Sequence, residues 1–184
     1  MIDVRIRRAV VDDAVAIARV RVESWRTTYR GMIPQPYLDA MTIEASATLW
    51  DKSLSAQSER SQVFVAEDAD GVLGFAAGIL LPEPKLGFDA DLAAIYLRPA
   101  YQRLGLGSKL VGVTAAALVA QAAASMIVWV IAANQPARDF YTALGAELIA
   151  EQPFQWDGMD LIEAGYGWRD LPALVARCNA VTVH

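Results

Sequence analysis

The sequence predicts a single α/β domain built around a mixed β-sheet. Segments with strand-like and helix-like patterns alternate along most of the chain, and no repeat, low-complexity tract or linker separates them. The length of 184 residues matches one ordinary domain. Hydrophobic residues make up 55% of the chain and charged residues 20%, so the composition differs clearly from that of disordered proteins. We therefore expect one domain with a sizeable core.

The first half of the chain predicts a strand, two helices and a hairpin. Asp12 and Asp13 are candidate N-caps for the first helix, and Thr42 opens the second. Between these helices, Pro34 and Pro36 interrupt the pattern and predict an irregular, partly helical stretch. "DADG" between two apolar runs favours a β-hairpin. In order, we expect a strand over 2–7, a helix over about 13–25, a helix from 42 to about 56, and paired strands over 61–68 and 71–80.

The second half continues the alternation. "PEPKLGFDA" (82–90) predicts a loop into the next strand, and Pro99 ends that strand. Pro136 and Gly145 stand where the first turn and the end of a helix favour those residues. In order, we expect a strand over 90–97, a long helix over about 105–123, a buried strand over 125–132, a helix over about 135–144, paired strands near 146–151 and 161–168, and a short helix over 171–178.

Charge and residue counts exclude several classes of chemistry. A formal net charge of −5 and a pI of about 4.9 argue against a nucleic-acid-binding protein, because no basic surplus is available for a phosphate backbone. Cys178 is the single cysteine, so the sequence offers neither an intrachain disulfide nor a zinc cluster, and we expect no metal site. His184, the single histidine, is the last residue, which argues against a catalytic site that depends on histidine.

The sequence favours a cytoplasmic location and gives no sign of a membrane partner. Residues 1–13 alternate charged and apolar side chains and lack an apolar run of the signal-peptide type. The alanine-rich segment 111–124 is interrupted by Gly112, Thr114 and Gln121, and it is shorter than the roughly 18 apolar residues that a spanning helix needs.

The segment "LRPAYQRLGLGSKL" (97–110) raises the main functional question. Gly105 and Gly107 lie where a helix is expected to begin, but the segment matches neither the Walker loop nor the dinucleotide fingerprint. Leu110 stands where the first needs Ser or Thr and the second needs Gly. A helix N-terminus offers free N–H groups to an anion, and glycine lets an anion approach the backbone. From these residues alone, the two glycines can be interpreted either as an anion-binding site or as a simple tight turn. Lys109 is expected to face solvent.

The longer segment "IYLRPAYQRLGLGSKLV" resembles the acetyl-CoA-binding motif of the GNAT N-acetyltransferase superfamily. That motif has Gln or Arg, two residues, Gly, one residue, and Gly or Ala, and Gln102, Gly105 and Gly107 match each fixed position. "NQPARDFYTALGAEL" resembles the superfamily's second cofactor segment, an Asn before a helix that carries a Tyr and ends in Leu-Gly. The resemblance spans residues 2–168 and implies a mixed, largely antiparallel sheet of about seven strands flanked by helices. It places the domain at 1–168 and a C-terminal helical extension at 169–184.

The resemblance implies acetyl-CoA as the acetyl donor and assigns roles to residues around it. The backbone N–H groups of the glycine segment would hold the pyrophosphate, the preceding strand would pair with the pantetheine arm, and one strand N–H would polarise the thioester carbonyl. Tyr141 would be the general acid for the departing thiolate, or else a half-buried tyrosine that satisfies a core contact. The implied cofactor residues are Ile95, Tyr96, Leu97, Gln102, Arg103, Leu104, Gly105, Leu106, Gly107, Ser108, Asn134 and Arg138.

The general base is harder to assign. Members of the superfamily often place a Glu near the start of the strand that enters the glycine motif, and this chain has Asp91 there. The shorter side chain of Asp91 favours a water relay over direct contact with the amine. Asp91 as a solvated strand-end residue is the alternative interpretation, and Glu67 or Glu83 are alternative bases.

The amine acceptor is expected to bind against aromatic residues. "WRTTYRGMIP" resembles a stretch near the acceptor site in an uncharacterised branch of the superfamily, and its Trp25 and Tyr29 are spaced to share a helix face. Trp156, expected in the loop before the last strand, is a further candidate wall. Core packing is the alternative fate of these residues, while aromatic walls with nearby carboxylates would suit an ammonium group.

The resemblance therefore implies an N-acetyltransferase that moves acetyl from acetyl-CoA to a primary amine of a small molecule or peptide, by direct attack on the thioester. A non-catalytic acyl-CoA-binding module of the same fold is the alternative. Tyr141 favours the enzyme, because a pure binder needs no acid at the sulfur. The superfamily frequently forms dimers, so a homodimer is a further expectation.

Overall fold

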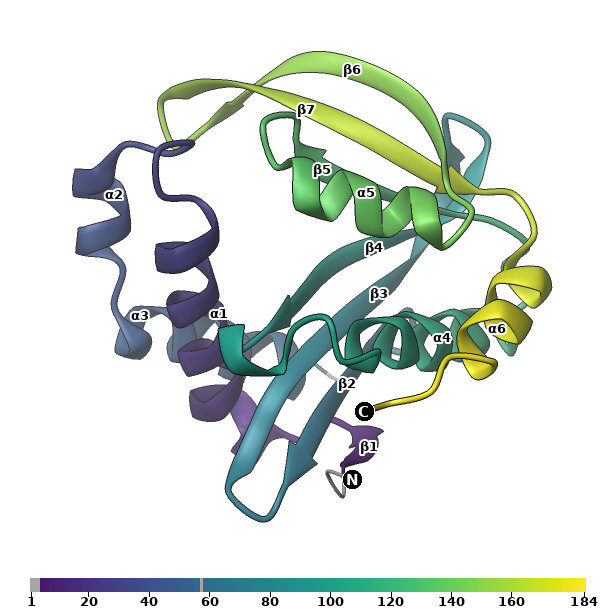
Figure 1. Ribbon diagram of the computed structural model, residues 1–184, viewed down its shortest axis with the longest axis horizontal. Coiled ribbons are helices and arrows are strands. Elements are labelled where there is room, and N and C mark those ends of the chain that lie inside the picture. Colours follow the sequence, from purple (N-terminus) through teal and green to yellow (C-terminus); the bar gives the residue numbers. More distant parts are fainter. Residues whose placement is uncertain (1–3, 57) are drawn as a thin grey trace.

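The structure is a computed structural model that describes residues 4–56 and 58–184. Its strands form one sheet of seven strands in the order β1-β2-β3-β4-β5-β7-β6 (Figure 1). Only β4 and β5 are parallel, which confirms the predicted mixed, largely antiparallel sheet. The strands are β1 (Arg5–Arg8), β2 (Ser61–Asp68), β3 (Gly71–Lys85), β4 (Phe88–Leu97), β5 (Met126–Ile131), β6 (Glu147–Trp156) and β7 (Met159–Trp168). The helices are α1 (Ala14–Thr28), α2 (Gln35–Ala40), α3 (Ile43–Ser55), α4 (Leu106–Val119), α5 (Gln135–Ala143) and α6 (Leu171–Asn179), with 3₁₀ turns at Val11–Asp13 and Pro99–Tyr101.

Two hairpins are longer than the sequence patterns predict. The expected loop over 82–90 is mostly strand, because β3 runs to Lys85 and β4 begins at Phe88. The two residues between them have positive φ, as a two-residue hairpin turn requires. In the same way β6 and β7 meet at a turn over 157–158. Trp156 is therefore the last residue of β6, and its expected place in a loop is wrong.

Several element bounds also differ from the expected ones, and α1 continues to Thr28 instead of ending near residue 25. Asp13 precedes α1 but does not cap it with its side chain; the carboxylate instead accepts from the Val10 N–H and binds Arg7. The stretch after α1 contains a regular short helix, α2. The predicted helix over 105–123 ends earlier, at Val119, because the chain turns through a positive φ at Ala122. The strand expected over 2–7 is β1 from Arg5 onward, and its first two residues lie outside the described part of the chain.

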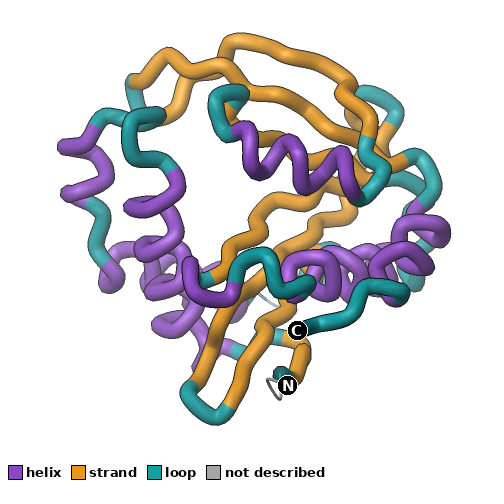
Figure 2. The backbone as a smooth tube through the Cα atoms, in the orientation of Figure 1, coloured by secondary structure: helices purple, strands orange, loops and turns teal. Residues whose placement is uncertain are grey.

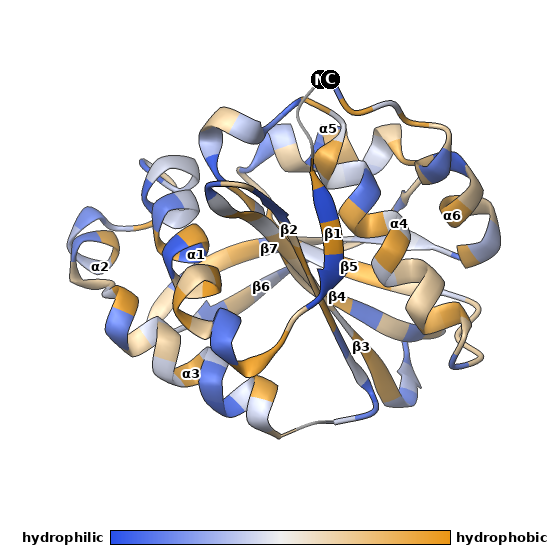
Figure 3. Cartoon of the chain, turned by 90° about the horizontal axis from the view of Figure 1, so that it is seen from below, coloured by the Kyte–Doolittle hydropathy of each residue, from blue (hydrophilic) through white to orange (hydrophobic). Residues whose placement is uncertain are grey.

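Helices cover both faces of the sheet (Figures 1 and 2). Alternate residues of β2 and β3 point to opposite sides: Phe64 and Ala76 pack with α4, while Val65 and Phe75 pack with Ile17 of α1. The alanine-rich segment that forms α4 lies between the sheet and α6, which explains why it is apolar almost all round. Figure 3 shows the contrast with β1 at the sheet edge, which is coloured hydrophilic over most of its length.

The centre of the sheet opens between β4 and β5. These two strands are paired only at Ala90–Met126 and Asp91–Ile127, and they then diverge. Just beyond the last pair, Ala93 is an extra residue in β4, since Leu92 opposes Gly78 and Ala94 opposes Ala77 on β3. Within the described residues, the backbone of β4 after this bulge has no strand partner on its β5 side.

Candidate active site

A cleft of about 350 Å³ occupies the opening between β4 and β5. Its walls are the second half of β4, the first turn of α4, the middle of β5 and one side of α5. We call it the donor cleft, because it is lined by most of the residues to which the resemblance gives a role at the acetyl donor. These are Ile95, Tyr96, Leu97, Gln102, Arg103, Gly105, Gly107, Ser108, Asn134 and Tyr141.

The glycine segment forms the turn that starts α4. Arg103 and Gly105 both have positive φ, at 61° and 86°, so the chain reverses sharply before the first helical residue, Leu106. This turn leaves the first N–H groups of α4 directed out of the helix end, where they can bind an anion. Leu106 is buried and does not line the cleft, and Leu104 does not line it either. The Leu106 side chain packs in the core, so only its backbone groups are available to a ligand.

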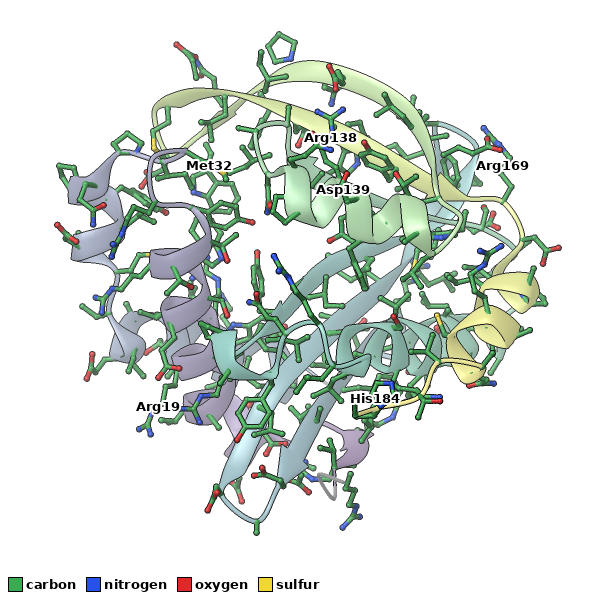
Figure 4. The ribbon with its side chains drawn as sticks, in the orientation of Figure 1. Arg19, Met32, Arg138, Asp139, Arg169 and His184 are labelled. Atoms are coloured by element: carbon green, nitrogen blue, oxygen red, sulfur yellow. The ribbon has the colours of Figure 1, made fainter. Side chains whose placement is uncertain are left out.

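The C-terminal residues pack directly on this turn. The backbone N–H of His184 donates to the Leu104 carbonyl at 3.1 Å, and a Cβ placed on Gly105 would lie 2.5 Å from the Thr182 carbonyl oxygen. Lys109 does not point freely into solvent as expected, since its Nζ donates to the Asn179 carbonyl at 2.9 Å and so ties α4 to the end of α6. Figure 4 shows His184 beside α4. The glycine turn is therefore held by the segment that follows α6.

Tyr141 reaches the donor cleft from α5. It is only 5% exposed and packs among Phe140, Tyr166 and Trp168 at ring-centroid distances of 5.4, 6.2 and 5.9 Å. Burial raises the pKa of Tyr141 above its usual value, and nearby Tyr96 raises it further. The hydroxyl is thus a proton donor at neutral pH and not a phenolate.

Asn134 and Arg138 differ in what they do at the start of α5. Asn134 is buried, lines the donor cleft and caps α5, because its Oδ1 accepts from the Ala137 N–H at 3.3 Å. Arg138 does not line the cleft. Its guanidinium donates to the Ala132 carbonyl, the Tyr166 hydroxyl and Glu151, and in Figure 4 it lies between α5 and the β6–β7 hairpin. The structure therefore gives Arg138 partners outside the cleft.

A second cleft, of about 380 Å³, lies on the face of the sheet that α1 and α3 cover. It is lined mainly by aromatic and aliphatic side chains, and we call it the aromatic cleft. The residues that line both clefts are Tyr29, Ala93, Ala94, Tyr96, Trp129 and Val130. The two clefts therefore meet at the bulge of β4, where that strand separates from β5.

The three aromatic residues predicted for the acceptor side come together here. Trp25 lies 4.8 Å from Tyr29 and 5.9 Å from Trp156, measured between ring centroids. Trp156 also donates its indole N–H to the Tyr37 hydroxyl at 3.0 Å, which links the end of β6 to α2. Trp25 and Tyr29 are buried in a small core cluster as well as lining the cleft, so packing and cleft formation coexist in the same side chains.

Asp91 stands beside this meeting point. The register pairs it with Ile79 of β3, which lines the aromatic cleft, although Asp91 itself lines neither cleft. Burial raises the pKa of Asp91 to about 6; Lys85 opposes this shift, and Glu163 adds to it. Asp91 can therefore exchange a proton near neutral pH.

The alternative bases lie elsewhere. Glu67 is bound to Arg7 with an N–O distance of 2.7 Å, and this ion pair lowers the pKa of Glu67. Glu67, the exposed Glu83 and Asp91 all lie outside the lining of the two clefts, but Asp91 is two residues from Ala93, which lines both, so Asp91 stays the candidate base.

Two charged residues that line the aromatic cleft were not predicted from the sequence. Glu163 lies on β7 and Arg21 on α1, one turn before Trp25. The signals were present: Leu161 and Glu163 share one face of a strand, and Arg21 and Trp25 share one face of a helix. Neither pattern predicts that this strand face and this helix face line the same cleft.

Two further observations concern possible cofactors and membranes. In the part of the chain that the structure describes, no group of three or more His, Cys, Asp or Glu side chains is placed to hold a metal ion. No helix over the same residues is long and apolar enough to cross a membrane.

Comparisons with known proteins agree with this geometry. Residues 20–146 match the model of the acetyltransferase (GNAT) family. An uncharacterised N-acetyltransferase of Bacillus subtilis, YuaI, is 41% identical over 96% of this chain and 99% of its own length. The crystal structure of PaiA N-acetyltransferase from Thermoplasma acidophilum in complex with coenzyme A has a TM-score of 0.68 at 20% identity, covering 89% of this chain and 98% of that one.

A third comparison concerns the acetyl form of the same ligand. The structure of YncA from Salmonella typhimurium with acetyl-CoA has a TM-score of 0.64 at 19% identity, covering 90% of this chain and 93% of that one. The fold is thus that of proteins solved with coenzyme A and with acetyl-CoA. On the family match and the Bacillus relative, the chain belongs to the acetyltransferase (GNAT) family.

Proposed function

We propose that this chain, an acetyl-CoA-dependent N-acetyltransferase, binds the donor in the cleft between β4 and β5 and the amine in the aromatic cleft, and that the amine attacks the thioester directly. The observation that carries the proposal is the meeting of the two clefts at the β4 bulge, at Ala93, Ala94 and Tyr96. When bound, acetyl-CoA supplies a thioester carbonyl that is open to attack and a thiolate that can leave.

The donor cleft fits such a ligand in two respects. On its β5 side, the backbone of β4 after Ala93 has no strand partner, so it can accept an extended amide chain as a further strand, and its N–H groups on that side can hold a carbonyl oxygen. The glycine turn at Arg103–Gly105 presents the N-terminus of α4 to a phosphate group. Gln102, Ser108 and Asn134 are the polar side chains we assign to donor binding from this set.

Proton transfer is assigned to Tyr141 and Asp91. Tyr141 donates a proton from its hydroxyl in the donor cleft, where its raised pKa keeps the proton in place until the thiolate departs. Asp91 accepts the proton of the incoming amine through water. Cys178 takes no part, because it is fully buried and burial raises the pKa of its thiol to about 11.

The proposed base gives a pH dependence. Asp91 must be ionised to accept a proton, so kcat is expected to fall as the pH decreases through about 6 and to level off above it. Asp91→Asn should lower kcat on the plateau and remove this limb, measured as kcat against pH with saturating amine and donor. An unchanged limb in Asp91→Asn would show that another group titrates.

The segment after α6 should support donor binding. Deletion of Val181–His184 removes the hydrogen bond to Leu104 and the packing on Gly105, so the glycine turn loses its support. We expect KM for acetyl-CoA to rise about three- to tenfold, the range that one hydrogen bond and its ordering effect supply, with KM for the amine unchanged. Steady-state kinetics measure both values, and an equal rise in both would contradict a role confined to the donor turn.

Direct attack can be tested without knowing the amine. Intact-protein mass spectrometry of the enzyme incubated with acetyl-CoA alone should show no acetylated protein, and thiol release should wait until an amine is added. An acetylated protein that passes its acetyl group to the amine would contradict direct transfer. The homodimer and the cytoplasmic location stay predictions.

A further inference from the structure

The charges in the aromatic cleft are few and separated. Arg21 and Glu163 are the charged residues among those that line it, Arg21 from α1 and Glu163 from β7, and no ion pair joins them in the described residues. The side chains that surround them are mainly apolar and aromatic, with Trp50, Trp129 and Phe154 added to those already described. A ligand that fills this cleft therefore meets a cation from one element, an anion from another and a mainly apolar surface around them.

The Arg21 guanidinium is available to a ligand. It lies over the Trp25 ring, 4.7 Å from the ring centroid. The ion pairs of the described residues involve Arg7, Arg98 and Arg138, and none involves Arg21. A guanidinium stacked on an aromatic ring keeps its N–H donors free in its own plane, and this fork suits a carboxylate. The buried indole N–H of Trp25 likewise has no partner among the described residues.

The opposite wall favours a cation. Glu163 accepts one hydrogen bond, from Gln152 Nε2 to its Oε1 at 2.8 Å, which leaves the second carboxylate oxygen free. Its charge is felt by Asp91 near the β4 bulge. Glu163 pairs with Ile131 of β5, next to Val130, which lines both clefts, so an ammonium group at Glu163 would lie close to the donor cleft.

We propose that the acceptor is a small zwitterionic amine with an apolar body, of the type of an apolar amino acid, with its ammonium group toward Glu163 and its carboxylate on Arg21. The proposal rests on the proposed function. The volume of about 380 Å³ lies in the range of small-ligand pockets. In the transfer, a nitrogen–carbon bond to the acetyl group forms while the carbon–sulfur bond breaks. The ammonium group loses two protons, one through water to Asp91 and on to solvent and one directly to solvent. The thiolate takes its proton from Tyr141, which regains one from solvent.

Matched substrates test the carboxylate. L-leucine, L-methionine and L-phenylalanine are compared with the amines that lack only their carboxylate, namely 3-methylbutylamine, 3-(methylthio)propylamine and 2-phenylethylamine, with putrescine as a dication. We expect kcat/KM for the best amino acid to exceed that of its matched amine by about tenfold or more, the value of a charge-assisted hydrogen-bonded pair. A preference for the matched amines or for putrescine would overturn the proposal.

Variants test whether Arg21 is the group responsible. Arg21→Met keeps an apolar stem against Trp25 and should raise KM for the amino acid about tenfold while leaving KM for the matched amine unchanged. Arg21→Lys should restore part of the loss. Arg19→Met is the matched control, because Arg19 is exposed on α1 and lines neither cleft, and Figure 4 shows it at the outer side of that helix.

The outcomes separate this proposal from the function on which it depends. An amino-acid preference that survives in Arg21→Met would overturn the assignment of the carboxylate to Arg21. Turnover of amines without any preference for amino acids would overturn the substrate class and leave the N-acetyltransferase function intact. Coenzyme A binding without turnover of any compound in the panel would contradict the proposed function itself.

Discussion

Tyr141→Phe is expected to lower kcat by about 100-fold or more, the usual effect of losing a positioned general acid. The substitution removes only the hydroxyl, and the ring keeps its place among Phe140, Tyr166 and Trp168. Because burial holds the pKa of Tyr141 above its usual value, the wild-type hydroxyl is protonated throughout the neutral range. Affinity for coenzyme A, measured by titration calorimetry, should change little.

A second tyrosine provides the control for that experiment. Tyr101 lies just before the glycine turn but lines neither cleft, so Tyr101→Phe should keep both kcat and coenzyme A affinity. If Tyr141→Phe turns over as fast as Tyr101→Phe, Tyr141 is not the acid and its hydroxyl serves packing alone.

Gly105→Ala should impair donor binding more than any other single change in the glycine turn. The φ of 86° at this position strains any residue with a Cβ, by about 1–3 kcal/mol. The added Cβ would also lie 2.5 Å from the Thr182 carbonyl oxygen and 3.0 Å from Val181, so the C-terminal segment must move. We expect the dissociation constant of coenzyme A to rise about tenfold or more, which corresponds to roughly 1.4 kcal/mol.

Gly158→Ala separates the two causes. Gly158, in the β6–β7 turn, has a similar φ of 77°, but a Cβ there would meet nothing within 4 Å. Both variants should lose thermal stability through backbone strain, whereas only Gly105→Ala should weaken coenzyme A binding. Equal binding by the two variants would show that the shape of the glycine turn does not control donor affinity.

The fold was predictable where the chain gives local signals. Asp70–Gly71 lies between two apolar runs and correctly predicted the β2–β3 hairpin. Thr42 caps α3, as its position in the sequence predicted. Asp157–Gly158 forms the same kind of turn, but its sequence signal is weak because the end of β6 is polar and contains Pro153. Proline is tolerated there because β6 is an edge strand. Pro82 and Pro84 near the end of β3 likewise favoured a loop, but the strand tolerates them because its pairing with β4 is irregular there.

The donor cleft was easier to predict from the sequence than the aromatic cleft. Its glycine turn is one continuous segment, so a single motif contains it. The aromatic cleft takes residues from two helices and several strands, and no local pattern predicts that Arg21 and Glu163 line the same cleft. Arg138 shows that closeness in sequence is not enough to place a residue in the cleft. It lies on the same helix as Asn134's cap position, four residues later, but its side chain binds Tyr166 on β7 and Glu151 on β6.

Amine-dependent thiol release, coupled to identification of the acetylated product, tests the central claim most directly. With acetyl-CoA and a panel of amines and amino acids, we expect free thiol to appear only in the presence of an accepted amine, in equal amount to an N-acetylated product found by mass spectrometry. Tight binding of coenzyme A with no N-acetylated product from any acceptor would contradict the account and identify the chain as an acyl-CoA-binding protein.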